Sequence, residues 1–277
     1  MQSNRRASRF MGLVAAGALT LVVGSSLNEA KSQAPAQKAP APAQQAPAQL
    51  DQQADRTLRA MSDYMAKLPQ WSADYDTDVE YVMRTGEKIQ LAASGNVEVK
   101  RPGSLHVVRR GGIADLEMFF NGKTFTIFGR GANTYAEKAI DGTIDQAIDT
   151  LRSDTGLELS GADLMASNVY AGLMNEVESS TYWGTTFVRG IECHYLTFRA
   201  RGVDWQIWIQ TGDKPLPMKY VITSKWMTGS PHYSISLWNW NTDRLIADNR
   251  FVFAPPSGVR KLEQLAVDEN QDLVPGR

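Results

Sequence analysis

The protein has 277 residues, with 29 Lys and Arg against 30 Asp and Glu, three His and one Cys. Its net charge of −1 supplies no basic surface to neutralise phosphates, which argues against nucleic acid as the main partner. A single Cys excludes an internal disulfide framework and every metal site built from several cysteines.

Residues 1–34 have the pattern of a secretory signal peptide. Three arginines precede an uncharged apolar run from Phe10 to Val23, which is shorter than the roughly 20 residues of a membrane span. Small residues between Ser26 and Ala34 offer cleavage sites, and the lack of a Cys there excludes lipoprotein processing. We therefore expect a soluble periplasmic protein. The alternative is an uncleaved membrane anchor, in which Leu27 extends the apolar run.

Residues 35–50 are predicted to form a linker, because they consist almost entirely of Ala, Pro and Gln. This composition has no apolar face to bury and indicates an extended, polyproline-like spacer. The folded domain is expected over residues 51–264, followed by a C-terminal tail over residues 265–277.

The domain is predicted to begin with an amphipathic helix over residues 51–68. Apolar side chains recur there at spacings of three and four, for example from Leu58 to Met65, and Pro69 ends the pattern. The apolar period then changes to two, which indicates strands. Residues 73–81 and residues 89–99 both alternate, so we expect a long hairpin.

Further short strands follow, two of them across an Asn121-Gly122 turn. A helical segment then interrupts the strands. Thr143 is expected to cap its first helix, and Ser160 with Asp163 to form the capping box of a second one. Strands resume near residue 177. About a dozen antiparallel strands and three helices predict a mainly β, α+β fold in a single domain.

The histidines and the cysteine do not form a recognisable catalytic arrangement. His106, His194 and His232 lie in separate strands, and we interpret each as a hydrogen-bonded structural residue. Cys193 adjoins His194, but neighbours on a strand point to opposite faces and cannot form a nucleophile–base pair. Cys193 is therefore interpreted as a small core residue.

Four carboxylates share one face of the first strand. They are Asp74, Asp76, Asp78 and Glu80. This row lacks the Gly-turned loop that wraps oxygen ligands around Ca²⁺, so we interpret it as a solvated strand face. No catalytic residue, metal ligand or cofactor is predicted, and an enzymatic function is not expected.

Tryptophan is concentrated in the second half of the chain. Alternation places Trp205 and Ile207 on one face of their strand and Trp208 on the other, and it predicts that Trp238 and Trp240 share a face. A sheet that is apolar on both sides must be covered by helices, curl around a cavity or dock to something apolar. A completely filled core and an open apolar cavity are both compatible with this pattern.

Five segments resemble a known family. They read FFNGKTFTIF (119–128), GIECHYLTFR (190–199), GVDWQIWIQ (202–210), KPLPMKYVIT (214–223) and FVFAPPSGVRKL (251–262). On these segments the chain resembles a family of predicted exported bacterial proteins with a domain of unknown function, which is related to the LolA/LolB-like lipoprotein carriers. The resemblance implies an eleven-stranded or similar antiparallel sheet, curled into an unclosed half-barrel, with helices covering its concave face.

In the carriers that concavity takes up acyl chains. The resemblance therefore implies a periplasmic protein that binds or carries a hydrophobic ligand, such as a lipid or a lipoprotein acyl chain, between sheet and helices. The candidate lining residues are Phe119, Phe125, Met165, Met174, Trp205, Ile207, Trp226, Trp238 and Trp240. The alternative is an envelope sensor or interaction module of the same fold, with an envelope protein as its partner. We expect a monomer, and peripheral contact with a membrane is compatible with either function.

Overall fold

The computed structural model describes residues 49–155 and 161–265. The predicted signal peptide, most of the predicted linker, the predicted capping residue Ser160 and the tail beyond Leu265 lie outside the described residues.

The described part of the chain alternates long strands with few helices. The helices are α1 (Gln52–Lys67), α2 (Ile144–Thr155) and α3 (Val169–Leu173), with the 3-10 helices η1 (Ala162–Met165) and η2 (Asp248–Phe251). The strands are β1 (Gln70–Val82), β2 (Lys88–Lys100), β3 (Ser104–Gly111), β4 (Leu116–Phe120), β5 (Thr124–Gly129), β6 (Thr134–Ala139), β7 (Val177–Val188), β8 (Ile191–Ala200), β9 (Val203–Gln210), β10 (Pro217–Ser224), β11 (His232–Asn241) and β12 (Arg260–Lys261).

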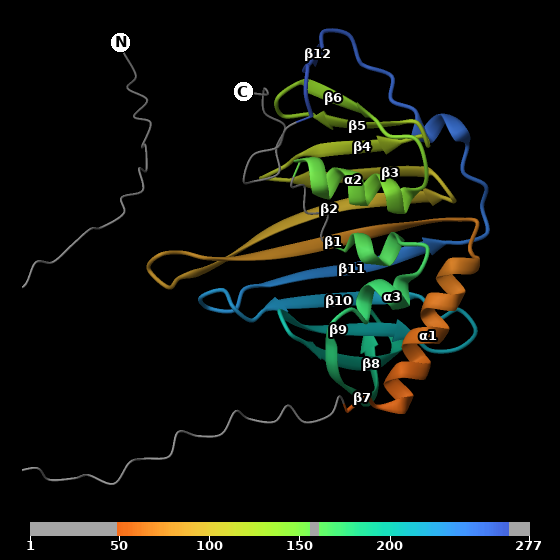
Figure 1. Ribbon diagram of the computed structural model, residues 1–277, viewed down its shortest axis with the longest axis vertical. Coiled ribbons are helices and arrows are strands. Elements are labelled where there is room, and N and C mark those ends of the chain that lie inside the picture. Colours follow the sequence, from red (N-terminus) through yellow and green to blue (C-terminus); the bar gives the residue numbers. More distant parts are fainter. Residues whose placement is uncertain (1–48, 156–160, 266–277) are drawn as a thin grey trace, which may run out of the picture. The chain divides into compact units, whose positions relative to one another are not determined.

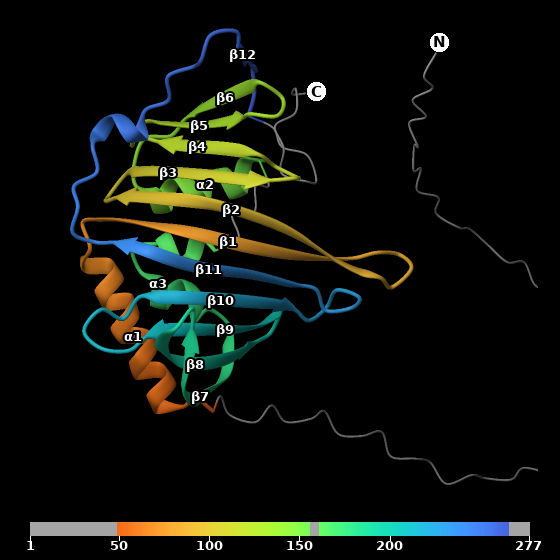
Figure 2. The same cartoon turned by 180° about the vertical axis from the view of Figure 1, so that it is seen from behind.

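The strands form one sheet in the order β12-β6-β5-β4-β3-β2-β1-β11-β10-β9-β8-β7. Its pairs are antiparallel except for β12 with β6. The sheet curls at the end formed by β7, β8 and β9 but does not close (Figure 1). The three α-helices lie on one face of the sheet, which we call the inner face (Figure 1). Figure 2 shows the opposite, outer face. The predicted mainly β, unclosed half-barrel is thus confirmed.

Helix α1 begins where the sequence predicts because Asp51 caps it. The Oδ1 atom of Asp51 accepts hydrogen bonds from the backbone N–H groups of Gln53 (2.7 Å) and Ala54 (3.1 Å). Its Oδ2 atom accepts from the N–H of Tyr182 in β7 at 3.2 Å. The cap thus also fixes the start of the helix to the sheet, and Met61 on its apolar side is completely buried.

The helical segment after β6 differs in part from the prediction. Helix α2 begins as expected, because Thr143 and Gln146 exchange hydrogen bonds between side chain and backbone N–H. The predicted second helix is split into η1 and α3. The physical reason is a new cap: the side chain of Asn168 accepts a hydrogen bond from the N–H of Ala171 at 3.0 Å and starts α3 there.

Close packing in the centre of the inner face depends on Gly95 in β2. A Cβ atom at Gly95 would lie 1.9 Å from the carbonyl oxygen of Val108 and 2.6 Å from the ring of Tyr75. The missing side chain lets the Tyr75 ring cross β2, where its hydroxyl donates to the Val108 carbonyl at 2.9 Å. Burial raises the pKa of Tyr75 to about 12, so the hydroxyl keeps its proton and remains a donor.

Candidate functional site

A hollow lies on the inner face between the short helices η1 and α3 and the strands β8, β9 and β10. Its volume is about 310 Å³, which is room for about ten groups of the size of a water molecule. It is lined by Asp163, Gly172, Leu173, Asn175, Glu176, Ala200, Gly202, Val203, Trp205, Tyr220 and Ile222. The hollow is partly open to solvent and lies within the size range of small-molecule sites.

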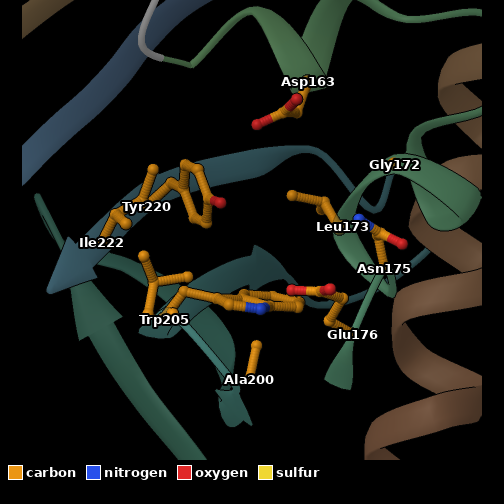
Figure 3. A pocket seen from close by; sticks show the side chains of 11 residues that line it. Asp163, Gly172, Leu173, Asn175, Glu176, Ala200, Trp205, Tyr220 and Ile222 are labelled. Carbon is orange, nitrogen blue, oxygen red and sulfur yellow. The ribbon is translucent and has the colours of Figure 1, made fainter. Parts of the chain in front are cut away.

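The floor of the hollow is aromatic and aliphatic. Trp205 lies flat against Phe198, with 3.8 Å between the ring centroids and 9° between the ring planes. Tyr220 meets Trp205 edge-on at 5.9 Å, and its hydroxyl end points across the space (Figure 3). Burial raises the pKa of Tyr220, so the hydroxyl stays neutral. The floor therefore offers apolar surface and no charge.

The rim of the hollow is polar and acidic. Asp163 extends toward the space from η1, while Asn175 and Glu176 border it from the turn between α3 and β7 (Figure 3). Asp163 and Glu176 are the charged residues of the lining, and both are acidic. A ligand with its apolar part on Trp205 would thus have two carboxylates near its polar end.

The cover of the hollow is fastened to α1 through Tyr170. Its backbone N–H donates to the Ser62 hydroxyl at 2.9 Å, and its hydroxyl donates to the Asp55 carboxylate. The Arg59 guanidinium also donates to this hydroxyl and lies over the ring, 3.8 Å from its centroid. Hydrogen bonds from Arg59 and from Tyr170 lower the pKa of Asp55. The short helix α3 is therefore fastened to α1 by these polar contacts, while its side chains Val169 and Leu173 are buried in the core.

The sequence-predicted lining residues do not all meet in this hollow. Trp205 lines it. Ile207 and Phe125 are completely buried in the core of the inner face, and Met165 and Met174 pack partly buried against that core.

The other predicted lining residues lie elsewhere. Phe119 stacks on His106, with 4.6 Å between the ring centroids, and Trp226 is largely exposed in the turn between β10 and β11. Trp238 pairs with Asp74 across the sheet, and its ring lies 4.2 Å from the guanidinium of Arg189.

The prediction that Trp238 and Trp240 share a face is wrong. Trp240 lies 5.1 Å from the core residue Trp71 between ring centroids, whereas Trp238 pairs with Asp74, which alternates with the core residues of β1. The register of β1 with β11 shifts at this point, and Asn239 has a φ of +51°. The irregularity inserts an extra residue and reverses the side that follows.

Sequence reasoning missed most of the lining. Tyr220 and Ile222 alternate on β10 as inner-face residues, and this pattern was visible, but it does not distinguish a cavity wall from a filled core. Leu173, Asn175 and Glu176 become neighbours of the sheet only because the predicted helix is interrupted. No local pattern in the sequence indicates that arrangement.

All three histidines have hydrogen-bond partners, as predicted. His106 is 2% exposed, and its Nδ1 and Nε2 atoms lie 2.8 Å and 2.9 Å from the carboxylates of Glu98 and Glu117. Burial alone would lower the pKa of His106, but the hydrogen bonds to the two carboxylates outweigh it and raise the pKa. Further contacts join Arg130 to Glu117 and Arg250 to Glu98. Asp115 also pairs with Arg130, so three carboxylates face two guanidinium groups and the imidazole.

The Nδ1 atom of His194 lies 2.9 Å from the hydroxyl of Tyr182, and the Nδ1 atom of His232 contacts the carboxylate of Glu80. Cys193 pairs with Gln210 and His194 with Ile209, so these two neighbours point to opposite faces, as expected.

Cys193 is completely buried, and burial is the main cause that raises the pKa of its thiol to about 11.

The acidic row of β1 is integrated into the sheet. Asp74 accepts from Asn96 and Asn239, and Asp76 accepts from Ser94. Glu80 differs from the predicted solvated face, because it is buried and paired with Lys88. Within residues 49–155 and 161–265, no group of three or more His, Cys, Asp or Glu side chains is arranged to hold a metal ion. None of the helices described is long and apolar enough to cross a membrane.

Comparison with solved structures gives matches at low sequence identity. An uncharacterised conserved protein from Thermus thermophilus has a TM-score of 0.45 and 10% identity, covering 76% of this chain and 99% of its own. The lipoprotein LppX of Mycobacterium tuberculosis has a TM-score of 0.42 and 15% identity, covering 70% and 100%. A LolA superfamily protein from Nitrosomonas europaea has a TM-score of 0.35 and 9% identity, covering 72% and 97%.

No protein of curated function matches the sequence. The family model described as predicted periplasmic protein (DUF2092) matches residues 54–265. This range contains all the strands of the sheet and all three α-helices, except for the first two residues of α1. The family description agrees with the periplasmic location expected from the sequence. The chain therefore belongs to the DUF2092 family of predicted periplasmic proteins.

Proposed function

We propose that this protein binds a hydrophobic ligand, a lipid or a lipoprotein acyl chain, in the hollow between α3 and the strands β8 to β10. The observation that carries the proposal is the uncharged floor of Trp205, Tyr220 and Ile222 beneath a partly open space of about 310 Å³. Apolar surface that faces solvent in a cavity is costly, and an alkyl chain that covers it gains about 0.8 kcal/mol for each buried CH₂.

The acidic rim narrows the chemistry of the ligand. A free fatty acid bound with its chain on the floor would bring its carboxylate close to Asp163 and Glu176, and like charges repel in a partly desolvated site. An acyl chain held in an ester or amide has no such charge. The rim therefore favours an acyl chain whose carboxyl group is esterified or amidated, as it is in lipids and lipoproteins.

The cover supplies a route for the ligand. Helix α3 spans only five residues and η1 only four, so neither is a stable helix by itself. Helix α3 stays in place through contacts such as those of Tyr170 with Asp55 and Arg59, and η1 through contacts such as the hydrogen bond from Arg101 to the carbonyl oxygen of Met165 at 3.1 Å. Movement of this cover away from Trp205 would enlarge the hollow for a chain longer than about ten methylene-sized groups.

Two measurements test the proposal. Protein purified from the periplasm is extracted with organic solvent, and the extract is analysed by mass spectrometry for acyl lipids. Delipidated protein is then titrated with an N-dansyl alkylamine, a neutral probe whose fluorescence rises in an apolar site. We expect co-purifying lipid and saturable probe binding.

A matched pair of variants locates the site. Ile222→Trp fills the hollow, whereas Val221→Trp places the same side chain on the outer face of the same strand. Displacing two methylene groups of the probe would weaken binding about tenfold, so only Ile222→Trp should lose affinity. Equal loss in both variants, or the absence of both lipid and probe binding, would contradict the proposal. Recovery of one envelope protein in stoichiometric amount without lipid would favour the interaction module instead.

A further inference from the structure

Two neighbouring hairpins extend beyond the rest of the sheet at the ends opposite α1. One joins β1 to β2 and the other joins β10 to β11, and both project on the same side (Figures 1 and 2). The turn of the second hairpin touches the side of the first, because a Cβ atom on Gly229 would lie 2.9 Å from the side chain of Val82 at the end of β1. The two tips therefore form one surface, which we call the hairpin tips and define as residues 81–89 and 225–230.

The hairpin tips expose large apolar side chains. Trp226 is 80% exposed, Met227 61% and Met83 47%, and Tyr81 and Ile89 are exposed as well. With about 150–250 Å² for a whole aromatic side chain, the five expose on the order of 500 Å² together. An exposed apolar area of this size is often functional, and none of its residues lines the hollow on the inner face.

Cationic side chains accompany these apolar groups. Arg84 lies in the turn of the first hairpin, and Arg201 lies in the turn between β8 and β9. The carbonyl oxygen of Arg201 accepts a hydrogen bond from the indole of Trp226 at 2.9 Å. Both arginines are exposed. Lys225 is paired with Asp204, and Lys88 with Glu80. Glu87 adds an exposed carboxylate to the first turn, so the two guanidinium groups leave one positive charge in excess.

We propose that the hairpin tips insert into the surface of an anionic lipid bilayer. An exposed indole with Met, Tyr and Ile beside it suits the boundary between head groups and acyl chains, and Arg side chains suit anionic head groups. The exposed apolar side chains sit on two projecting turns instead of one flat face. In a bilayer each of these side chains can insert by itself, because no partner surface of matching shape is needed.

This inference does not depend on what the hollow binds. Its test is co-sedimentation of the full mature chain with vesicles of phosphatidylethanolamine and phosphatidylglycerol, compared with vesicles of phosphatidylcholine alone. We expect binding to the first, weaker binding to the second, and a decrease with added salt. Lipids brominated near the head group should quench part of the tryptophan fluorescence.

The matched variants are Trp226→Ser with Met227→Ser, and Trp183→Ser as the control. Trp183 is 63% exposed on β7, and its indole also makes one hydrogen bond, to Thr197. Removing the apolar surface of Trp226 and Met227 should weaken vesicle binding by about tenfold or more, whereas Trp183→Ser should bind like the unchanged protein. Circular dichroism checks that each variant is folded.

Three results would overturn the inference. They are no binding of the unchanged protein to either kind of vesicle, equal loss in Trp183→Ser, and a dimer in sedimentation that the double variant abolishes. The last would assign the hairpin tips to a second copy of the chain. Binding of the N-dansyl alkylamine should be the same in the double variant, so failure here is distinguishable from failure of the proposed ligand site.

Discussion

Replacing His106 with Gln should lower the free energy of unfolding by about 2–3 kcal/mol at pH 6. The imidazole lies between the Glu98 and Glu117 carboxylates, at 2.8 Å and 2.9 Å. Two acceptors require an N–H group on each ring nitrogen, so the geometry selects the charged imidazolium. In the Gln variant the two carboxylates lose the positive charge of the imidazolium between them.

The magnitude follows from the contacts. A hydrogen bond between charged groups contributes about 1.5–3 kcal/mol, and two of them are lost. Both carboxylates are partly exposed and keep Arg130 or Arg250 as a partner, which reduces the loss to about half of the sum. For a domain of this size, the expected decrease in Tm is about 4–12 °C.

The effect should depend on pH with a defined sign. The pKa of His106 is raised in the folded protein, so its stabilisation is complete below the ordinary value of about 6.5 and is lost as the pH rises through the raised value. Unfolding in urea at pH 6 and at pH 9 measures this. The difference between the unchanged protein and His106→Gln should be large at pH 6 and small at pH 9.

A control separates charge from simple packing. In His194→Gln the lost partner is the Tyr182 hydroxyl, not a carboxylate, so its cost should change less between the two pH values. If His106→Gln were as stable as the unchanged protein at pH 6, or if its cost increased toward pH 9, the assignment of a buried imidazolium would be wrong.

Three further predictions follow from single contacts. Gly95→Ala places a Cβ atom against the Tyr75 ring and the sheet backbone and should cost about 3 kcal/mol or prevent folding, as measured by urea unfolding beside Tyr75→Phe at about 1 kcal/mol. Tyr170→Phe removes the bonds to Asp55 and Arg59 and should speed entry of the N-dansyl alkylamine in stopped-flow fluorescence; an unchanged rate would exclude α3 as the cover. Glu176→Gln should tighten binding of a dansyl-labelled fatty acid without changing that of the neutral probe, and equal changes for both would refute the role of rim charge.

Much of the sheet could be predicted because its signals are local. The alternation from Ala73 to Tyr81 is the side-chain period of a strand, and the turn at Asn121-Gly122 forms as expected, with Gly122 at a φ of +84°. Asp51 and Thr143 cap their helices through neighbours two or three residues away. These features need no knowledge of distant parts of the chain.

The rest depends on contacts between distant segments. The reversal at Trp240 arises from the register of β11 against β1, which lies more than a hundred residues earlier. The hollow exists because the segment around Leu173 crosses β8 to β10 without filling the space above Trp205. Apolar content alone predicts burial at both places, and it cannot distinguish a wall from a packed interior.

The sheet order also has a consequence for how the chain folds. Strands β2 to β6 extend from one side of β1 and strands β11 to β7 from the other, so each half is a meander of neighbouring strands that meet at β1 and β11. That seam joins residues as far apart as Asp78 and Ser234, 156 positions along the chain. Pairings of such separation form slowly. Until β11 arrives, β1 has an unpaired edge able to recruit another chain, so a chain shortened within β11 should aggregate instead of folding to a smaller sheet.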